Sequence, residues 1–113
     1  VSASCHRVPV LDGHTMAIWA DIPDPVEKVA EAFLNFVPPI SSLPTLPEKS
    51  VRFFTEPDRP QPRLDRMRGK GMTVSVGRIR EGIRFIAMGH NTIRGAAGAS
   101  VLNAELISTK NYL

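Results

Sequence analysis

The sequence is poor in cysteine, because Cys5 is the only one in 113 residues. A single thiol excludes an internal disulfide framework and suits a reducing compartment, so we expect a cytoplasmic protein. No run approaches the roughly 20 consecutive apolar residues that a membrane-spanning helix needs. The first residues, VSASCHRVPV, lack the charged start and apolar block of a signal peptide. They also lack an initiator methionine and are already β-prone, so we expect a piece of a longer protein.

Aromatic residues are scarce too, at 6% of the chain, and the charges nearly balance, with 14 Lys and Arg against 11 Asp and Glu. The basic residues gather between residues 58 and 70, interleaved with Asp58 and Asp65 and with no aromatic residue among them. A surface that binds nucleic acid needs a continuous basic face and rings on which bases stack. We therefore expect no nucleic-acid partner, and we expect residues 56–71 to form a long, solvated polar loop.

Metal-binding signals are weak. The possible ligands are Cys5, His6, His14 and His90, and no pair of them has the CxxC or HxxxH spacing of a zinc site. We therefore expect no metal ion. The remaining composition, with 42% hydrophobic and 22% charged residues, is that of an ordinary globular domain with a single core.

The clearest helix signal begins at Asp24, a good N-cap that is followed by Pro25 and, three residues after the cap, by Glu27. Apolar side chains then recur at helical spacing and form one stripe, which consists of Val26, Val29, Ala30, Phe33, Phe36 and Val37. Pro38-Pro39 is expected to end this helix. The spacing predicts a helix that covers one face of a sheet, followed by a proline-rich stretch over 38–50 without regular structure.

Alternating or continuous apolar runs predict strands over residues 14–20, 51–55, 72–80 and 83–90. Glu81-Gly82 separates the last two, which are expected to form an antiparallel hairpin. The order of elements predicts an α+β fold with a mainly antiparallel mixed sheet that is covered by helices. The hairpin has more apolar surface than one helix covers, so we hypothesise that it forms a homodimer interface through Met72, Val74, Val76, Phe85 and Ile86.

The segment NTIRGAAGASVLNAELIS predicts a C-terminal helix that opens at Asn91 or Thr92. Its first turns contain Gly95 and Gly98, and a glycine in a helix costs about 1 kcal/mol relative to alanine. Close approach of another backbone or of a ligand is the natural reason for two such residues.

Arg7 and His14 are the pair with the clearest chemical potential. An imidazole can accept and return a proton near neutral pH, and a guanidinium can hold a carboxylate through two parallel hydrogen bonds. On a straight strand they would point to opposite faces, but a turn at Asp12-Gly13 allows both side chains to reach one pocket. The spacing alone favours the simpler interpretation, in which His14 starts a strand and Arg7 lies on the surface.

Four segments of the chain carry a family resemblance. SASCHRVPVLDGHT, RPQPRLDR, GMTVSVGRIR and GHNTIRGAAGASVLNAEL occur in this order over nearly the whole chain. Together they resemble aspartate-semialdehyde dehydrogenases, particularly the archaeal and fungal branch. The resemblance implies that His14 is the acid/base histidine and that Arg7 holds the α-carboxylate of the substrate. It implies that Asn91 contacts the nicotinamide end of NADP.

The family reaction implied by this resemblance is reversible and uses phosphate. A cysteine thiolate attacks aspartate semialdehyde, hydride passes to NADP, and phosphate releases the thioester as β-aspartyl phosphate, so biosynthesis of lysine, threonine, methionine and isoleucine runs the reaction in reverse. The nucleophile of the family lies in an Asn-Cys context in the other half of the enzyme, so Cys5 is not expected to be the nucleophile. No GxGxxG strand–turn–helix is present either, and the 113-residue chain alone is expected to be inactive.

The resemblance also implies a division of the chain. Residues 1–90 correspond to part of the C-terminal catalytic and dimerisation domain, which associates as a homodimer or higher homo-oligomer. Residues 91–113 correspond to a helix that returns to the absent NADP-binding Rossmann domain, and the small residues of this helix would pack on that domain.

Three alternatives remain at this stage. A malonyl-CoA reductase of the same branch keeps a comparable arginine and histidine and would need a pocket for a coenzyme A thioester. N-acetyl-glutamyl-phosphate reductase shares the chemistry but fits the GHNTIRGAAGA block less well. The chain could also serve only as a dimerisation module without turnover.

Overall fold

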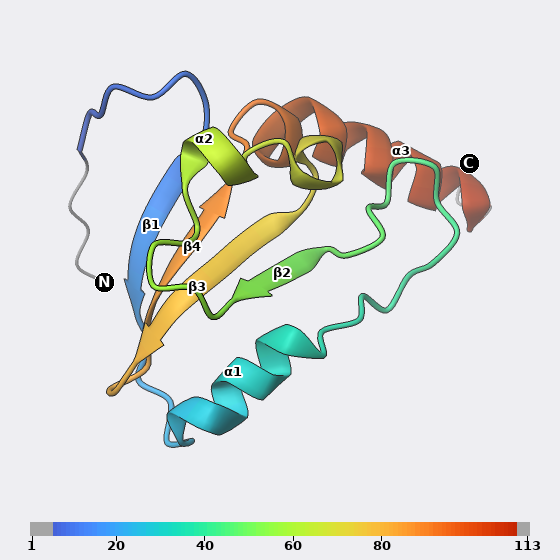
Figure 1. Ribbon diagram of the computed structural model, residues 1–113. Helices are drawn as coiled ribbons and strands as arrows, with labels where there is room; N and C mark the ends of the chain where they lie inside the picture. The colour runs from blue at the N-terminus through green and yellow to red at the C-terminus, as the bar shows by residue number, and fades with distance from the viewer. Residues whose placement is uncertain (1–5, 111–113) are drawn as a thin grey trace.

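The computed structural model describes residues 6–110, and the sheet at its centre has four strands in the order β1-β4-β3-β2. Strand β4 pairs antiparallel with both of its neighbours, whereas β2 and β3 run parallel. Figure 1 shows these strands, which are β1 (His14–Trp19), β2 (Val51–Phe54), β3 (Val74–Arg80) and β4 (Arg84–Gly89). The predicted α+β fold with a mainly antiparallel mixed sheet is confirmed. The four predicted strands are present, with ends that differ by one or two residues.

The pairing of β1 with β4 defines the two ends of the sheet. His14 lies opposite Gly89, the last residue of β4, whereas Trp19 lies opposite Arg84, its first residue. The turn from β3 into β4 occupies residues 81–83, so the predicted antiparallel hairpin is confirmed. His14 therefore lies at the end of the sheet that is farthest from the hairpin turn.

Helix α1 (Val26–Leu34) covers part of one face of the sheet and packs against β2 and β3. Its apolar stripe meets the sheet through Phe33, whose ring stacks on Phe53 at 6.2 Å and meets Phe85 edge-on at 5.1 Å between ring centroids. The predicted start of this helix was wrong by one residue. Pro25 is the N-cap, with extended φ and ψ, and the Asp24 carboxylate accepts a hydrogen bond from Lys28 Nζ instead of capping the helix.

The predicted end of α1 also needs correction. The helix stops at Leu34, so Phe36 and Val37 lie outside it and are exposed. As expected, residues 38–50 contain no helix or strand. Thr45 ties this stretch to the C-terminal helix, because its backbone N–H and its hydroxyl both donate to the Glu105 carboxylate, at 2.9 and 2.6 Å.

The segment 56–71 folds over the face of the sheet opposite α1, and the prediction of a solvated loop was wrong. It contains helix α2 (Pro62–Asp65) and a helical turn η1 (Arg68–Gly71). The guanidinium groups of Arg59 and Arg68 lie over the Phe54 ring, at 4.7 and 5.0 Å from its centroid. Phe54 is buried, so Arg59 and Arg68, which looked solvated, form part of the packing on this face, whereas Arg63 and Lys70 are exposed as expected.

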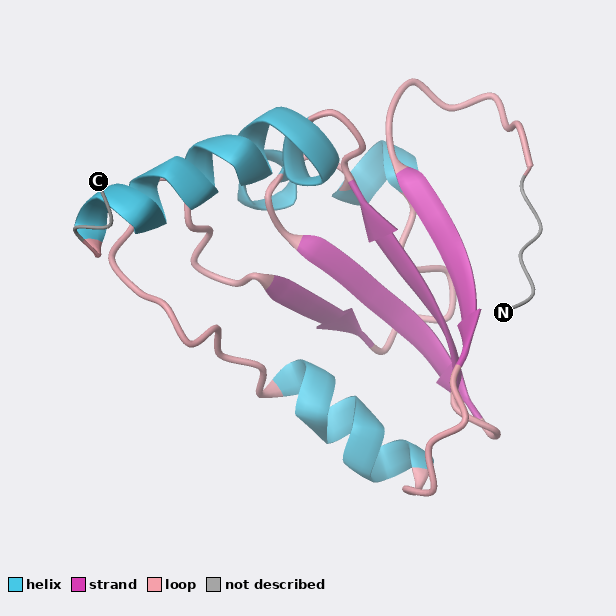
Figure 2. Cartoon of the chain, turned by 180° about the vertical axis from the view of Figure 1, so that it is seen from behind, coloured by secondary structure: helices cyan, strands magenta, loops and turns pink. Residues whose placement is uncertain are grey.

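The C-terminal helix begins as predicted after Thr92, which caps a π-helical turn, η2 (Ile93–Ala97), that continues into α3 (Gly98–Thr109). Figures 1 and 2 both show α3 across the end of the sheet where β3 begins. A Cβ at Gly98 would lie 2.5 Å from the Met72 sulfur, so this glycine is needed for packing inside the chain itself. The expected packing of the small residues of this helix on another domain stays a prediction.

The hypothesised dimer surface is reduced by burial within the chain. Met72 and Val76 are buried within the chain, at 4% and 3% exposure, so they are unavailable to a partner. No residue of α3 is buried among those described, so one long helix has most of its surface open. None of the helices within residues 6–110 has the length and apolar character needed to cross a membrane.

Candidate active site

His14 is the first residue of β1, and its exposed side chain stands at the end of the sheet. The chain enters the strand through a bend at residues 11 and 12, as the Asp12-Gly13 turn signal predicted. Gly13 has a φ of 112°, a conformation that L side chains rarely adopt. A Cβ at this position would lie 3.5 Å from both the Met88 sulfur and Pro62 Cβ, so the turn is packed against β4 and α2.

Asn91 reaches this turn from a segment 78 residues further along the chain. Its Oδ1 accepts a hydrogen bond of 3.0 Å from the backbone N–H of Gly13, the residue directly before His14. This hydrogen bond therefore joins the segment of Asn91, which the resemblance links to cofactor binding, to the segment of His14, which it links to proton transfer. No sequence pattern pairs the start of β1 with the end of β4, so this contact was not predicted.

His90 precedes Asn91 and is buried, at 5% exposure. Its Nδ1 accepts from the backbone N–H of Ile93 at 3.3 Å and lies 3.3 Å from the Thr92 hydroxyl. Its Nε2 faces the Asp12 carboxylate at 4.0 Å, which is within ion-pair distance but too long for a hydrogen bond. From the sequence, His90 was only a weak metal candidate and Asp12 only a turn residue.

Arg7 lies in the exposed segment before the bend. Among residues 6–110, no hydrogen bond or ion pair joins Arg7 to His14, so the predicted common pocket stays a prediction. Cys5 lies outside the described residues. Within the described part of the chain, no group of three His, Cys, Asp or Glu side chains gathers as a metal cluster would.

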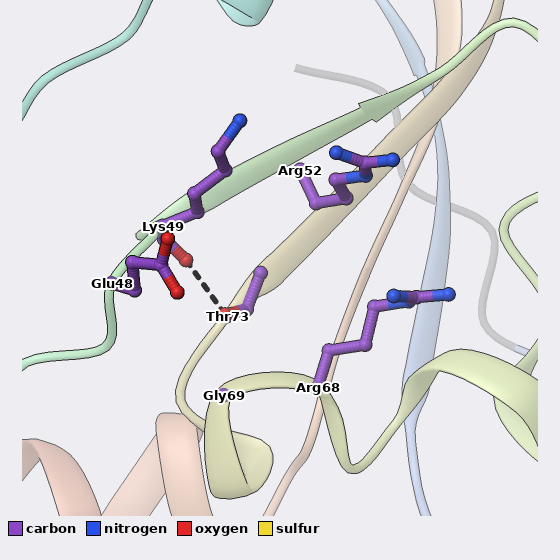
Figure 3. Close-up of a pocket in the computed structure, with 6 residues that line it drawn as sticks. All are labelled: Glu48, Lys49, Arg52, Arg68, Gly69 and Thr73. Atoms are coloured by element: carbon purple, nitrogen blue, oxygen red, sulfur yellow. Dashed lines mark hydrogen bonds between the residues drawn. The ribbon is translucent and has the colours of Figure 1, made fainter.

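A separate pocket of about 420 Å³ opens beside β2 and η1. Figure 3 shows its lining residues, which are Glu48, Lys49, Arg52, Arg68, Gly69 and Thr73. The Lys49 side chain extends away from Arg68 in this view, and Arg68 Nε already donates to Asp65 at 2.7 Å. Arg52 lies 5.6 Å from the centroid of the Phe54 ring. None of the predicted site residues lines this pocket, so it is distinct from the His14 end of the sheet.

The strongest electrostatic feature is Asp65, which is fully buried beneath Arg59 and Arg68. Burial alone would raise the pKa of its carboxyl group, but hydrogen bonds from Arg59, from Arg68 and from the backbone N–H of Gln61 outweigh it. The net effect lowers the pKa of Asp65 from 3.8 to about 2. The hydrogen bond to Asp65 in turn raises the pKa of Arg59. This cluster fixes the cover of the sheet and lies apart from His14, so we assign it a structural role.

Comparisons with known proteins agree with the motifs. Residues 1–94 match the family model described as "Semialdehyde dehydrogenase, dimerisation domain". The aspartate-semialdehyde dehydrogenase of Archaeoglobus fulgidus is 57% identical in an alignment that covers 95% of this chain and 32% of that protein. Its counterpart from Methanothermobacter thermautotrophicus is 51% identical, over 96% of this chain and 34% of that protein.

A solved structure gives the same result. The crystal structure of aspartate-semialdehyde dehydrogenase with NADP from Candida albicans superposes with a TM-score of 0.79 at 43% identity, and the match covers 95% of this chain and 33% of that one. The chain thus spans about a third of the length of the curated relatives it matches. The resemblance inferred from the sequence motifs is confirmed. The chain therefore belongs to the semialdehyde dehydrogenases, and its residues 1–94 match their dimerisation domain.

Proposed function

We propose that this chain is the C-terminal portion of an NADP-dependent aspartate-semialdehyde dehydrogenase, which reduces L-aspartyl-4-phosphate to L-aspartate 4-semialdehyde with release of phosphate. The names of the relatives from archaea and fungi support this substrate, and the NADP in the Candida albicans structure supports the cofactor. The observation that carries the proposal is the hydrogen bond from Gly13 to Asn91, because it joins the segment that would bind the cofactor to the turn that presents His14.

His14 is the proposed acid/base residue. Its ring is exposed at the end of a paired strand, so the backbone beneath it is held while the imidazole remains accessible to a substrate. An imidazole in this position can take the proton of the catalytic thiol and manage proton transfer at the tetrahedral intermediates. The proposed source of the thiol is another part of the complete polypeptide, since Cys5 is not expected to be the nucleophile.

Arg7 is the proposed residue that binds the α-carboxylate of the substrate. It is exposed in the segment that leads into the turn before His14, so a carboxylate can approach its guanidinium from solvent. Two parallel hydrogen bonds from a guanidinium fix a carboxylate in both position and orientation. Arg7 therefore contributes to substrate binding more than to the chemical step.

Asn91 fits a role at the nicotinamide end of NADP, which supplies the hydride acceptor and donor of the reaction. Its Oδ1 accepts from Gly13 N–H, which leaves the two N–H groups of Nδ2 as donors for a ligand. An amide with free donors and a fixed orientation can bind a carbonyl oxygen such as that of a carboxamide. We propose the division made from the sequence, with residues 91–113 returning to a Rossmann domain, and the open surface of α3 supports it.

We also propose that the complete enzyme is a homodimer or a higher homo-oligomer, since the family model is that of a dimerisation domain. Substrate and phosphate are its proposed small-molecule partners. Sedimentation of the complete polypeptide at micromolar concentration tests the assembly, and a monomer that retains full turnover would contradict it.

The activity is tested with the complete polypeptide that contains this segment. Phosphate-dependent reduction of NADP by aspartate semialdehyde is expected, with little oxidation of NADPH by malonyl-CoA. Arg7→Ala should raise KM for the semialdehyde and leave KM for NADP unchanged, whereas Arg80→Ala, at the exposed end of β3, should change neither. Activity with malonyl-CoA alone would show that malonyl-CoA, and not the semialdehyde, is the substrate. A folded protein that is inactive with both compounds would show that this segment serves only dimerisation.

A further inference from the structure

The dipeptide His90-Asn91 holds the turn Asp12-Gly13 through both of its side chains. Asn91 Oδ1 accepts from the backbone N–H of Gly13 at 3.0 Å. One residue earlier on each side, His90 Nε2 faces the Asp12 carboxylate at 4.0 Å. We refer to these two contacts between residues 90–91 and 12–13 as the turn clamp.

The clamp is itself held in place. Since Nδ1 of His90 accepts from the backbone N–H of Ile93, the ring proton belongs on Nε2 and is directed at Asp12. The His90 backbone carbonyl accepts from the N–H of Gly95, which closes the first turn of η2. His90 is buried, so this orientation is enforced by packing as well as by hydrogen bonds.

His14 follows the clamped turn directly. Its backbone is paired with Gly89 on one side, and on the other it is joined to Gly13, which has a positive φ and donates its N–H to Asn91. The chain is thus fixed before His14 and beside it, while the imidazole stays exposed. A catalytic group needs this kind of support, because a displacement of about 1 Å can reduce the rate by about 100-fold.

We propose that His90 and Asn91 are positioning residues for His14, and that Asn91 links the site of the cofactor to the orientation of the acid/base histidine. This inference rests on the proposed function. The Oδ1 of Asn91 holds the turn while Nδ2 is available to the nicotinamide end of NADP, so one side chain serves both segments. Binding of the cofactor at Nδ2 would then order the same amide that holds Gly13.

The two halves of the Asn91 amide can be separated by substitution. Asn91→Ala removes both functions, whereas Asn91→Asp keeps an oxygen that accepts from Gly13 N–H and removes the Nδ2 donors. In the complete polypeptide, Asn91→Ala should lower kcat by about 10- to 100-fold and raise KM for NADP. Asn91→Asp should recover most of kcat while KM for NADP stays high. Asn35→Ala, at the exposed end of α1, is the matched control and should change neither.

Hydrogen exchange gives a readout that does not depend on turnover. In the complete wild-type polypeptide, the Gly13 amide should exchange slowly. It should exchange quickly in Asn91→Ala, which lacks the acceptor, and slowly again in Asn91→Asp, which keeps it. If Asn91→Ala fails to fold, Asp12→Asn, at a half-exposed position, should still speed exchange at Gly13 and lower kcat. Equal losses of kcat in Asn91→Ala and Asn91→Asp, or rapid exchange at Gly13 in the wild type, would overturn the clamp. A wild-type enzyme that does not use the semialdehyde would contradict the proposed function alone. The rate of hydrogen exchange at Gly13 would still test whether the turn clamp is present.

Discussion

Arg59 and Asp65 form a two-point ion pair in which the carboxylate is fully buried. Arg59 Nε donates to Asp65 Oδ2 at 2.8 Å and Arg59 Nη2 donates to Oδ1, while Arg68 Nε donates to Oδ1 from the other side. Both arginines also cover the ring of Phe54 on β2. A single carboxylate therefore organises the segment that closes one face of the sheet.

Removal of that carboxylate should destabilise the fold. Asp65→Asn leaves two guanidinium groups without their anion beside a buried ring, and loss of one partner from a buried ion pair costs about 3 kcal/mol. Urea unfolding of the complete polypeptide measures the change in the free energy of unfolding. Asp58→Asn is the control, because Asp58 is exposed and accepts a hydrogen bond from the Gln61 side chain. Equal stability of the two variants would refute the role assigned to Asp65.

The same carboxylate makes stability depend on acid pH. The pKa of Asp65 is lowered from 3.8 to about 2 on folding, so its stabilisation is present above about pH 4 and is lost as the pH falls through about 2. A shift of this size corresponds to about 2 kcal/mol. The stability gap between wild type and Asp65→Asn should therefore narrow as the pH is lowered from about 5 towards 2. A gap that stays constant over this range would show that ionised Asp65 is not its source.

Gly95 and Gly98 should respond in opposite ways to alanine. At Gly98 a Cβ would meet the buried Met72 sulfur at 2.5 Å, so Gly98→Ala should destabilise the protein by about 1–3 kcal/mol through overpacking. At Gly95 the nearest atom to such a Cβ is the His90 carbonyl oxygen, at 3.6 Å. Gly95→Ala should be neutral or stabilise by up to about 1 kcal/mol. Thermal unfolding of both variants compares them directly, and a stabilising Gly98→Ala would be inconsistent with the packing described.

Phe33 is the residue through which α1 should contribute most to stability. Its ring contacts Phe53 and Phe85 on two different strands, so Phe33→Ala should cost about 2–4 kcal/mol. Phe36→Ala, three residues on and outside the helix, should cost much less because Phe36 is exposed. Comparable losses in the two variants, measured by urea unfolding, would mean that the stripe extends past Leu34.

Local patterns were enough to predict the strands, the hairpin and the order of elements, because alternation and the Glu81-Gly82 turn act over a few residues. They were not enough to predict the parallel pairing of β2 with β3, or the contact of Asn91 with Gly13, because these join distant segments. The prediction of Asp24 as the N-cap was wrong because its carboxylate binds Lys28 instead. The helical turns of segment 56–71 were missed because the buried Asp65 acts through Arg59, Arg68 and Gln61, which only the folded chain brings together.

For the same reason, some residues of the candidate site were predicted from the sequence and others were missed. His14 and Arg7 were found through a resemblance, since their spacing alone favoured a surface residue and a strand residue. Nothing in the sequence indicated that His90 faces Asp12, or that the turn before His14 is held by the residues that follow β4. The juxtaposition of Arg7 and His14 stays a prediction.

The central claim is that His14 carries out acid/base catalysis on aspartate semialdehyde. Its most direct test is kcat of the complete polypeptide for His14→Ala, with Thr15→Ala, the exposed next residue of β1, as the matched variant. We predict that His14→Ala lowers kcat by about 100- to 10,000-fold with KM for the semialdehyde little changed, while Thr15→Ala stays near wild type. A His14→Ala enzyme that turns over the semialdehyde at the wild-type rate would contradict the assignment.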